Sequence, residues 1–539
     1  MQKIIVVGSG ASGVHFALTA LERGHHVTLI DAGQARPPVS NLGDSFSDLK
    51  EKLADPVHYF LGETFETVVY PGSRREYYTK PYAFPPSKND VFALPADFDV
   101  AAQGFEPLFS FAQGGLAEAW TGGVYPFNDA ELEAFPLSYA ELEPWYSRVA
   151  ERIGICAQDD DLARFFPLHG NVIPPLRLDE NSQQLVQSYQ KHRAYITQRL
   201  KTYLGRSRVA TLSSDKGDRK ACSYCGRCLW GCPNQSLYTP SATLNACRQY
   251  AQFEYVPETF ASHFTYNASH QVTALIAQTR GDAAPRAFVG DAYVLAAGTL
   301  CSSKIFMDSI WRQTGEIVKL TGLMDNRQIL VPFVNLKFLG ARYNPVNYQY
   351  HQLALGIETP NPAEYVHGQI TTLKTALLHP IIYNVPVDLA ASLSIFRNLR
   401  AALGVVNLNL HDWRRAENYL TLQPQDGGER TRLVIQYSAP SKEPERIKQM
   451  VGIVKKVLWR LGCLVPPSMV HVRPMGSSVH YAGTLPMTTA RAPLTASKNC
   501  ASHDFENLFL VDGATFPFLP AKNISFTLMA NAARVAHAM

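Results

Sequence analysis

Long hydrophobic runs and an excess of charge of one sign are both missing from this sequence. No stretch reaches about 18 uninterrupted apolar residues, so we expect no membrane-spanning helix. Lysine and arginine together number 50 and aspartate and glutamate 46, which leaves a net charge of +4. Because no basic run interleaved with aromatic residues accompanies this balance, nucleic acid is not an expected partner.

Secretory signals, low-complexity segments and internal repeats are missing as well. An apolar strand is expected to start at Lys3, which leaves no room for a signal peptide, so we expect a cytoplasmic protein. In that compartment the nine cysteines should be thiols or metal ligands rather than disulfides. The composition, with 46% hydrophobic and 18% charged residues, is that of a globular protein.

A strand–turn–helix pattern opens the chain. The apolar run at residues 4–7 predicts a strand buried on both faces, and residues 14–23 predict a helix. A second strand at residues 27–30 ends in Asp31. The turn at residues 8–13 reads Gly-Ser-Gly-Ala-Ser-Gly, which is the G-x-G-x-x-G pattern of dinucleotide-binding folds.

Each glycine of this turn has a separate physical role. Gly8 allows a tight turn, Gly10 lets the backbone approach a pyrophosphate, and Gly13 lets the helix pack closely on the strand. The helix N-terminus offers free N–H groups to phosphates, and Asp31 can bind ribose hydroxyls. The motif predicts a bound dinucleotide but does not by itself separate FAD from NAD. Its predicted contacts are Gly8, Gly10, Ala11, Ser12, Gly13 and Asp31.

Two further motifs lie near the C-terminus. His480 opens the sequence H-x-x-G-T-x-x-M, and a strand at residues 507–511 then ends in an Asp-Gly pair. Asn523 opens Asn-Ile-Ser-Phe-Thr at the start of an apolar helix over residues 525–537. In this order the motifs resemble the glucose–methanol–choline (GMC) oxidoreductases, a family of FAD enzymes that act on alcohols. Ile524 stands where that family has proline.

Other segments extend the resemblance. Residues 114–121 resemble the flavin-covering loop of the pyranose 2-oxidase branch, in which a histidine before the tryptophan is bonded to the flavin. This chain has Ala119 in that place, so the resemblance implies non-covalent FAD. A strand at residues 291–298 resembles the family's strand that ends in Ala-Gly. Further cofactor contacts implied by the resemblance are Gly115, Trp120, Ala297, Gly298, Asp512, Gly513 and Ser525.

The resemblance implies an α/β fold, with a Rossmann-like FAD-binding domain and an α+β substrate domain built on an antiparallel sheet. We expect residues 1–130, 215–310 and 470–539 to form the discontinuous FAD domain, and residues 131–214 and 311–469 to form the substrate domain.

Three elements are expected within that substrate domain. Alternation at residues 431–437 predicts a strand, and residues 443–461 predict a helix against that same sheet. Residues 388–403 predict a helix that ends before Gly404. Core packing is favoured for this helix, and the alternatives are that it lines the substrate entrance or touches a membrane surface.

Alcohol oxidation requires a base for the hydroxyl proton and an acceptor for a hydride. A neutral imidazole suits the first task near neutral pH, and His480 matches the family's base position. Asn523 matches the partner that hydrogen-bonds the substrate oxygen. The alternatives are that His480 is a satisfied core histidine and that Asn523 only caps the last helix.

The sharpest local pattern is a cysteine cluster. The spacing C-x2-C-x2-C-x3-C-P is that of bacterial ferredoxins, in which one copy gives three ligands to one cluster. A 3Fe–4S cluster would fit, whereas a 4Fe–4S cluster would also need a rearranged fourth cysteine or a remote thiolate such as Cys247 or Cys301. Zinc is less favoured, and reduced thiols packing a tight loop are the structural alternative. The candidate ligands are Cys222, Cys225, Cys228 and Cys232.

The favoured function is FAD-dependent oxidation of an alcohol, a sugar or polyol secondary alcohol above all, with electrons passed to oxygen or to an external acceptor such as an electron-acceptor protein. One alternative is a non-redox lyase or isomerase on the same scaffold. The other is an iron–sulfur flavoprotein that acts mainly in electron transfer. The sequence leaves the substrate, the acceptor and the oligomeric state open.

Overall fold

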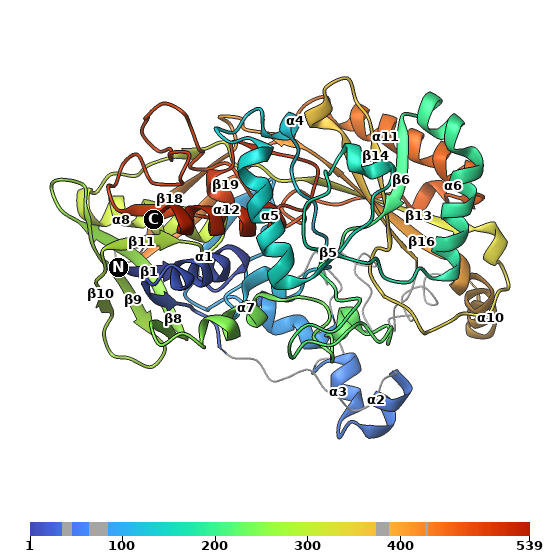
Figure 1. Cartoon of the computed structure of the whole chain (residues 1–539), viewed down its shortest axis with the longest axis horizontal. Helices are drawn as coiled ribbons and strands as arrows, with labels where there is room; N and C mark the ends of the chain where they lie inside the picture. Colours follow the sequence, from blue (N-terminus) through green and yellow to red (C-terminus); the bar gives the residue numbers. More distant parts are fainter. Residues whose placement is uncertain (35–45, 64–84, 373–386, 426–429) are drawn as a thin grey trace.

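The structure is a computed structural model that describes residues 1–34, 46–63, 85–372, 387–425 and 430–539. A parallel sheet lies at one end of the molecule, together with both chain termini, and a larger antiparallel sheet lies at the other end (Figure 1). The two short helices α2 (Phe46–Lys52) and α3 (Pro56–Leu61) project from one side (Figure 1), and their aromatic rings pack on Trp230.

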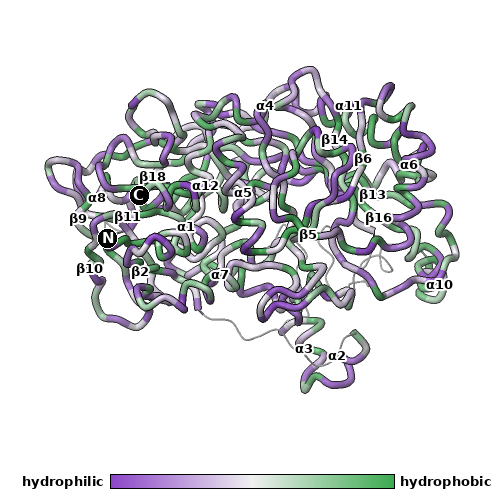
Figure 2. The backbone as a smooth tube through the Cα atoms, viewed as in Figure 1, coloured by the Kyte–Doolittle hydropathy of each residue, from purple (hydrophilic) through white to green (hydrophobic). Residues whose placement is uncertain are grey.

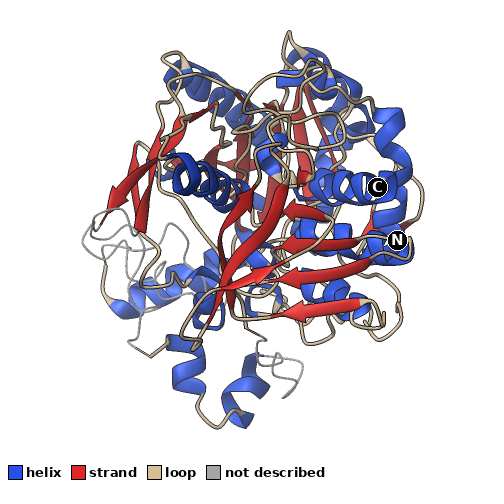
Figure 3. Ribbon diagram, turned by 90° about the vertical axis from the view of Figure 1, so that its left-hand side faces the viewer, coloured by secondary structure: helices blue, strands red, loops and turns tan. Residues whose placement is uncertain are grey.

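The parallel sheet has five strands in the order β22-β11-β1-β2-β7, and every neighbouring pair is parallel. These strands run side by side near the chain ends (Figure 3). Their apolar runs are buried, as predicted for a sheet covered on both faces. The strands are β1 (Lys3–Val7), β2 (His26–Ile30), β7 (Phe253–Val256), β11 (Ala292–Leu295) and β22 (Leu508–Leu510).

Helices cover one face of this sheet, and strands with one helix cover the other. Alternate residues of β1 separate the two cores: Ile4 and Val6 face the helices, while Ile5 and Val7 face the opposite side. On the helical side lie α1 (Ala11–Glu22), α5 (Tyr139–Ile153), α7 (Pro240–Cys247) and α12 (Ser525–Ala538). On the other side lie α8 (Thr299–Thr314), β8 (Thr259–Tyr266), β9 (Val272–Thr279) and β10 (Arg286–Phe288).

Hydropathy follows this layering. The tube through the central helices α1 and α12 is largely white to green, whereas purple segments are frequent in the outer loops (Figure 2). Every residue of α1 from Ser12 to Leu21 is buried, so this part of the helix has no face exposed to solvent. The predicted helix boundaries are close to the observed ones: α1 begins at Ala11, three residues before the predicted start, and α12 runs one residue past its predicted end.

The second large sheet is antiparallel, with seven strands in the order β20-β13-β16-β15-β14-β6 and β21 paired to β13. One face packs on the long helices α6 (Glu180–Arg199) and α11 (Glu443–Arg460) through an apolar core. The strands are β6 (Thr202–Arg206), β13 (Arg327–Asn335), β14 (Leu353–Ile357), β15 (Val366–Thr372), β16 (Leu403–Leu410), β20 (Cys463–Leu464) and β21 (His471–Val472).

A four-stranded sheet adjoins the parallel sheet, with its strands in the order β12-β18-β19-β3. Its apolar residues share one core with β1 and β11. Its strands are β3 (Val100–Gln103), β12 (Leu320–Thr321), β18 (Tyr419–Gln425) and β19 (Arg430–Gln436). The remaining short elements are α4 (Asp129–Leu132), β4 (Ile155–Cys156), β5 (Val172–Ile173), β17 (Asp412–Trp413) and β23 (Phe518–Leu519).

Two predicted helices form but pack differently from expectation. The strand predicted at residues 431–437 is β19, yet α11 contacts β13 and β20 of the seven-stranded sheet instead of the sheet of β19. Helix α10 (Leu389–Leu399) ends before Leu403, which starts β16, and only Ser392 and Phe396 of this helix are buried. The prediction of core packing for this segment was therefore wrong for most of its apolar residues.

The α/β fold class is confirmed: a Rossmann-like parallel sheet adjoins an α+β unit built on an antiparallel sheet. Across residues 1–34, 46–63, 85–372, 387–425 and 430–539, no helix is both long and apolar enough to span a bilayer.

Candidate active site

A cavity of about 390 Å³ opens at the carboxyl ends of β1, β2 and β11. The first turn of α1 forms one wall, with Ser9, Gly10, Ala11 and Ser12 in its lining. No described atom lies within 4 Å of the position that a Cβ of Gly10 would take, so the backbone there is open to a ligand. Helix N-termini with open backbone are suited to bind phosphate.

The other two glycines of the turn are required by close packing. Gly8 has a φ of +100°, and a Cβ there would lie 2.6 Å from the carbonyl oxygen of Ala296. A Cβ on Gly13 would lie 2.0 Å from the carbonyl oxygen of Gly8. Gly13 therefore sits behind the cavity wall rather than in it, and lets α1 approach β1.

Asp31 lies at the end of β2 and lines the same cavity. Its carboxylate accepts hydrogen bonds from the Ser9 hydroxyl and, at 3.0 Å, from the Tyr255 hydroxyl. Burial raises the pKa of Asp31, while these donors oppose the shift. The side chain is thus held rigidly at the place where a ribose of a bound dinucleotide would lie.

The opposite wall comes from segments distant in sequence. Ala297, Gly298, Asp512, Gly513 and Ser525 all line the cavity, as does Gly115. The Asp512 carboxylate accepts from the Ser302 hydroxyl at 2.5 Å and from the Ala514 N–H at 3.0 Å, and burial raises the pKa of Asp512 to about 6.

The last helix begins at this wall. Ile524, Ser525 and Leu528 at the start of α12 reach the cavity, so the positive end of that helix dipole faces it.

His480 and Asn523 lie together beside this cavity. The Nε2 atom of His480 is 3.3 Å from Nδ2 of Asn523, and both neighbouring residues Val479 and Ile524 line the cavity. Asn523 does not cap α12. The N-cap residue is Ile524, and within the described residues no side chain makes a capping hydrogen bond at this helix end. The predicted alternative role as a helix cap is therefore not the one this side chain performs.

The hydrogen bonds around His480 fix its tautomer. Asn326 donates from Nδ2 to the carbonyls of Leu410 and Pro520, at 2.9 and 3.0 Å, so its Oδ1 faces His480. That oxygen only accepts, so Nδ1 of His480, 2.9 Å away, carries the proton. Burial lowers the pKa of His480 to about 4, which keeps the ring neutral and leaves Nε2 as an acceptor.

Asn523 is oriented from the other side by Gln369. The Nε2 atom of Gln369 on β15 donates to Oδ1 of Asn523 at 2.6 Å, so Nδ2 of Asn523 points at His480. Four side chains thus form one chain of hydrogen bonds, Asn326–His480–Asn523–Gln369. A hydroxyl entering between His480 and Asn523 would donate to an imidazole lone pair and accept from an amide N–H.

The loop that carries His480 is strained and strongly held. Val479 has a φ of 59°, a left-handed conformation that is costly for a β-branched residue. Behind it, the buried Asp325 carboxylate accepts from the Gly476 N–H at 2.6 Å and from the Ser478 hydroxyl, whose Oγ accepts the His480 N–H.

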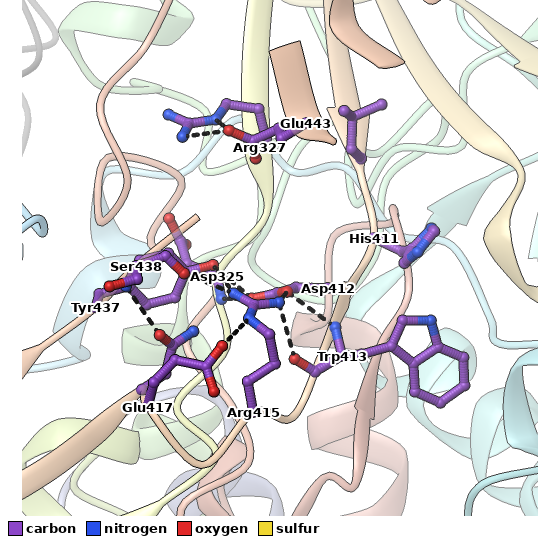
Figure 4. A network of polar contacts seen from close by, with 12 residues as sticks. Asp325, Arg327, His411, Asp412, Trp413, Arg415, Glu417, Tyr437, Ser438 and Glu443 are labelled. Carbon is purple, nitrogen blue, oxygen red and sulfur yellow. Dashed lines mark hydrogen bonds and ion pairs between the residues drawn. The ribbon is translucent and has the colours of Figure 1, made fainter. Parts of the chain in front are cut away.

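Asp325 belongs to a larger polar network (Figure 4). The Asp325 N–H donates to Asp412, which also accepts from the Arg415 guanidinium and the Tyr437 hydroxyl, both at 2.6 Å (Figure 4). Burial and the neighbouring Asp412 charge raise the pKa of Asp325 to about 7. This network anchors the strained loop to the four-stranded sheet through β19 and the segment after it.

Two groups of predicted residues lie elsewhere. Trp120 is outside the cavity lining, and its indole N–H donates to the carbonyl of Tyr238 at 2.7 Å. The cysteine quartet Cys222, Cys225, Cys228 and Cys232 lines a separate small apolar hollow with Thr211 and Tyr348.

The iron–sulfur prediction gains no support from this hollow. Within the described part of the chain, no three His, Cys, Asp or Glu side chains are arranged to hold a metal ion. Burial raises the pKa of Cys222 to about 12 and that of Cys228 well above its usual value, which favours the thiol form where no metal ion is bound.

Sequence reasoning missed the residues that orient the pair. Asn326 precedes β13 and Gln369 lies in the middle of β15, in segments that carry no motif. It also missed Lys522, whose ammonium is fully buried next to Asn523 in sequence and paired with Glu131. No local signal points to these three residues, since each acts through a partner far away in the chain.

Comparisons with known proteins agree with this geometry. Residues 415–532 match the family model described as GMC oxidoreductase. No curated protein sequence gives a significant match.

Several solved structures share the fold over nearly their full length. Pyridoxine 4-oxidase from Mesorbium loti is 14% identical with a TM-score of 0.59, covering 99% of this chain and 98% of its own. A formate oxidase is 11% identical with a TM-score of 0.62, covering 99% and 97%. An FAD-dependent oxidoreductase from Chaetomium thermophilum is 12% identical with a TM-score of 0.58, covering 99% and 98%.

The residues around the cavity fit FAD: an open backbone cradle at Gly10, a buried carboxylate at Asp31 and a helix N-terminus at Ser525. Residues 415–532 thus match the GMC oxidoreductase family, and the chain as a whole shares the fold of these solved oxidoreductases.

Proposed function

We propose that the chain oxidises a secondary alcohol of a sugar or polyol to a carbonyl, with His480 as the base. The observation that carries this proposal is the unprotonated Nε2 of His480, held toward Asn523 at the edge of the cavity. The hydroxyl proton of the substrate moves to Nε2, and Asn523 Nδ2 donates to the substrate oxygen. Bound FAD would supply the acceptor for the hydride that leaves the carbon.

The residues of this chain prepare that step in three ways. Asn326 holds the imidazole in the tautomer that can accept a proton. Gln369 holds the amide of Asn523 with its N–H outward. The N-terminus of α12 favours the negative charge of a reduced flavin. Electrons would then pass to oxygen or to an external acceptor.

The remaining site assignments belong to the same proposal. FAD would contact the cavity-lining residues of α1, β2, α8 and α12, without a covalent bond because Ala119 replaces the linking histidine. We further propose the discontinuous FAD domain of residues 1–130, 215–310 and 470–539, with residues 131–214 and 311–469 as the substrate domain.

Anaerobic mixing of the FAD-loaded enzyme with a panel of sugars, polyols and simple alcohols tests the proposal. Flavin absorbance should bleach with a substrate, and His480→Ala should slow bleaching by on the order of a hundredfold or more. His169→Asn is the matched control, because His169 is also buried with its pKa lowered to about 4 but bonds the Gly170 carbonyl.

Equal bleaching by the His480→Ala variant and the wild type would remove the base assignment. Product formed while the flavin stays oxidised would favour a lyase or isomerase instead.

A further inference from the structure

One face of the seven-stranded sheet is polar although it is buried. In antiparallel pairs, residues directly opposite one another share a face. Gln328 on β13 pairs with Asn409 on β16, which pairs with His367 on β15. In the next row Asn407 on β16 pairs with Gln369 on β15. The face therefore presents four amides and one imidazole in two adjacent rows.

The opposite face of the same strands is apolar. Ile329 and Val331 on β13 and Val406 and Leu408 on β16 pack on α6 and α11. A sheet with one polar face usually turns that face to solvent. Here His367 and Asn409 are fully buried, so the polar face is closed off from water by the rest of the molecule.

Several atoms of this polar face have no partner within the described residues. These are both ring nitrogens of His367, both amide atoms of Asn409 and Oδ1 of Asn407. Nε2 of the nearby buried His351 is likewise unpartnered there. A buried polar atom without a partner is costly, and native proteins satisfy nearly all of them. Such a cluster marks a place where a polar ligand or water completes the bonding.

The polar face reaches the catalytic pair. Asn326, two residues before Gln328, bonds His480, and Gln369 bonds Asn523. Gly123 lies over the same spot: a Cβ there would be 2.9 Å from Gln369 Nε2, 3.1 Å from His351 Nε2 and 3.2 Å from Asn523 Oδ1. A side chain at this position would overlap these polar atoms, so glycine lets the backbone of residue 123 lie directly against them beside Asn523.

These groups are all neutral. Burial lowers the pKa of His351 to about 4 and that of His367 well below its usual value. Lys522, whose charge acts on His367, is already paired with Glu131. A charged substrate would therefore meet no counter-charge from these groups, and an aliphatic chain would leave the amides unpaired.

We propose that this face, formed by His351, His367, Gln369, Asn407 and Asn409, binds the non-reacting hydroxyls of a neutral polyhydroxy substrate. The assignment rests on the proposed function, which places the reacting hydroxyl between His480 and Asn523. Each hydroxyl both donates and accepts, which matches a mixed set of amides and neutral imidazoles. Discrimination arises because a substrate without these hydroxyls leaves buried polar groups unpaired.

The test measures binding separately from oxidation. Isothermal titration calorimetry on the FAD-loaded His480→Ala enzyme compares ring and chain probes of equal carbon count: myo-inositol against cyclohexanol, and sorbitol against 1-hexanol. We expect the polyhydroxy probe of at least one pair to bind at least about tenfold tighter. Adding Asn409→Leu should reduce that preference at least tenfold without lowering the melting temperature, since an unpaired amide is replaced by an apolar group.

Asn335→Leu in the same background is the matched control. Asn335 is a buried asparagine on β13 whose amide donates to Asn181 and Gln184, at 2.7 and 2.5 Å. Its replacement should lower the melting temperature and leave the binding preference unchanged.

Equal binding of both members of each pair by the His480→Ala enzyme would overturn the inference. So would a preference that survives Asn409→Leu. If the preference is present but the wild type never bleaches its flavin, the hydroxyl site stands and the oxidation proposal fails.

Discussion

The buried ion pair beside Asn523 yields a quantitative prediction. Lys522 and Glu131 are both fully buried. The Lys522 ammonium donates to Glu131 and to the carbonyls of Pro126 and Phe165, at 2.8 and 2.7 Å. Lys522→Met leaves the Glu131 carboxylate buried without its cation. Breaking a buried pair in this way costs about 3–5 kcal/mol of unfolding free energy.

A double variant separates the charge from the packing. In Lys522→Met/Glu131→Gln the amide can still accept the Asn128 N–H that Glu131 accepts at 2.9 Å, but no charge is buried. The Pro126 carbonyl still loses its donor, whereas the Phe165 carbonyl keeps a hydrogen bond from Asn128 Nδ2 at 2.7 Å, so we expect a loss of about 2 kcal/mol. An unfolding entropy of about 2.1 cal/mol/K per residue gives roughly 1.1 kcal/mol/K for the chain. The single variant should therefore melt about 3–4 °C lower and the double variant about 2 °C lower.

The pH dependence of the stability loss shows whether the buried charge of Glu131 is its cause. Burial raises the pKa of Glu131 even with Lys522 present. Without Lys522 the folded-state pKa lies still higher above the unfolded value, so the native state prefers the protonated acid. The loss should then be largest at pH 8 and shrink as the pH falls toward 5, whereas the loss of the double variant, which has no ionisable group at either position, should not shrink. Thermal scans of the FAD-loaded enzymes by circular dichroism measure this. A Lys522→Met loss of equal size at both pH values would refute the reasoning.

Two further predictions concern the cofactor cradle and the base. Gly10→Ala should fold but retain FAD about tenfold less tightly, because its methyl group enters open cavity, whereas Gly13→Ala should yield little folded protein, because its methyl would overlap the Gly8 carbonyl. Circular dichroism and flavin fluorescence distinguish the two, and equal FAD retention by Gly10→Ala and the wild type would contradict the first. Asn326→Asp places a carboxylate on the Nδ1–H of His480, whose pKa is held at about 4 by burial, so the acid limb of kcat/KM should move to higher pH by about one unit or more. An unmoved acid limb in the pH profile would show that Asn326 does not act through His480.

The nucleotide cradle could be predicted because its parts are contiguous. The turn from Gly8 to Gly13 and the acid at Asp31 belong to one strand–helix–strand unit, and each residue's role follows from local geometry. The sequence predicted less well which elements pack against one another. The periodicity of α11 gives its apolar face but not which sheet it covers, and α11 packs on β13 rather than beside β19.

The pair His480 and Asn523 could be predicted only through a family resemblance. The residues that orient this pair could not be predicted from the sequence at all. Asn326 and Gln369 lie 154 positions from the residues they bond, and the strand register that brings them together is absent from a single sequence. The iron–sulfur hypothesis drawn from the cysteine spacing gains no support from the structure. A ligand pattern defines a sequence distance, but the structure gives the described thiols no ion-binding arrangement.

The buried polar face of the seven-stranded sheet could not be predicted for a more general reason. The alternation in β15, Val-His-Gly-Gln-Ile-Thr-Thr, and the end of β16, Asn-Leu-Asn-Leu, is legible in the sequence. Alternation of this kind normally indicates one buried and one solvated face. What it cannot indicate is that the polar face is covered too, so that His367 and Asn409 lie buried with unpaired atoms. Amphipathic strands normally expose their polar face to solvent. A polar face that is buried with unpaired atoms therefore indicates a ligand, because such atoms destabilise the fold unless something binds them.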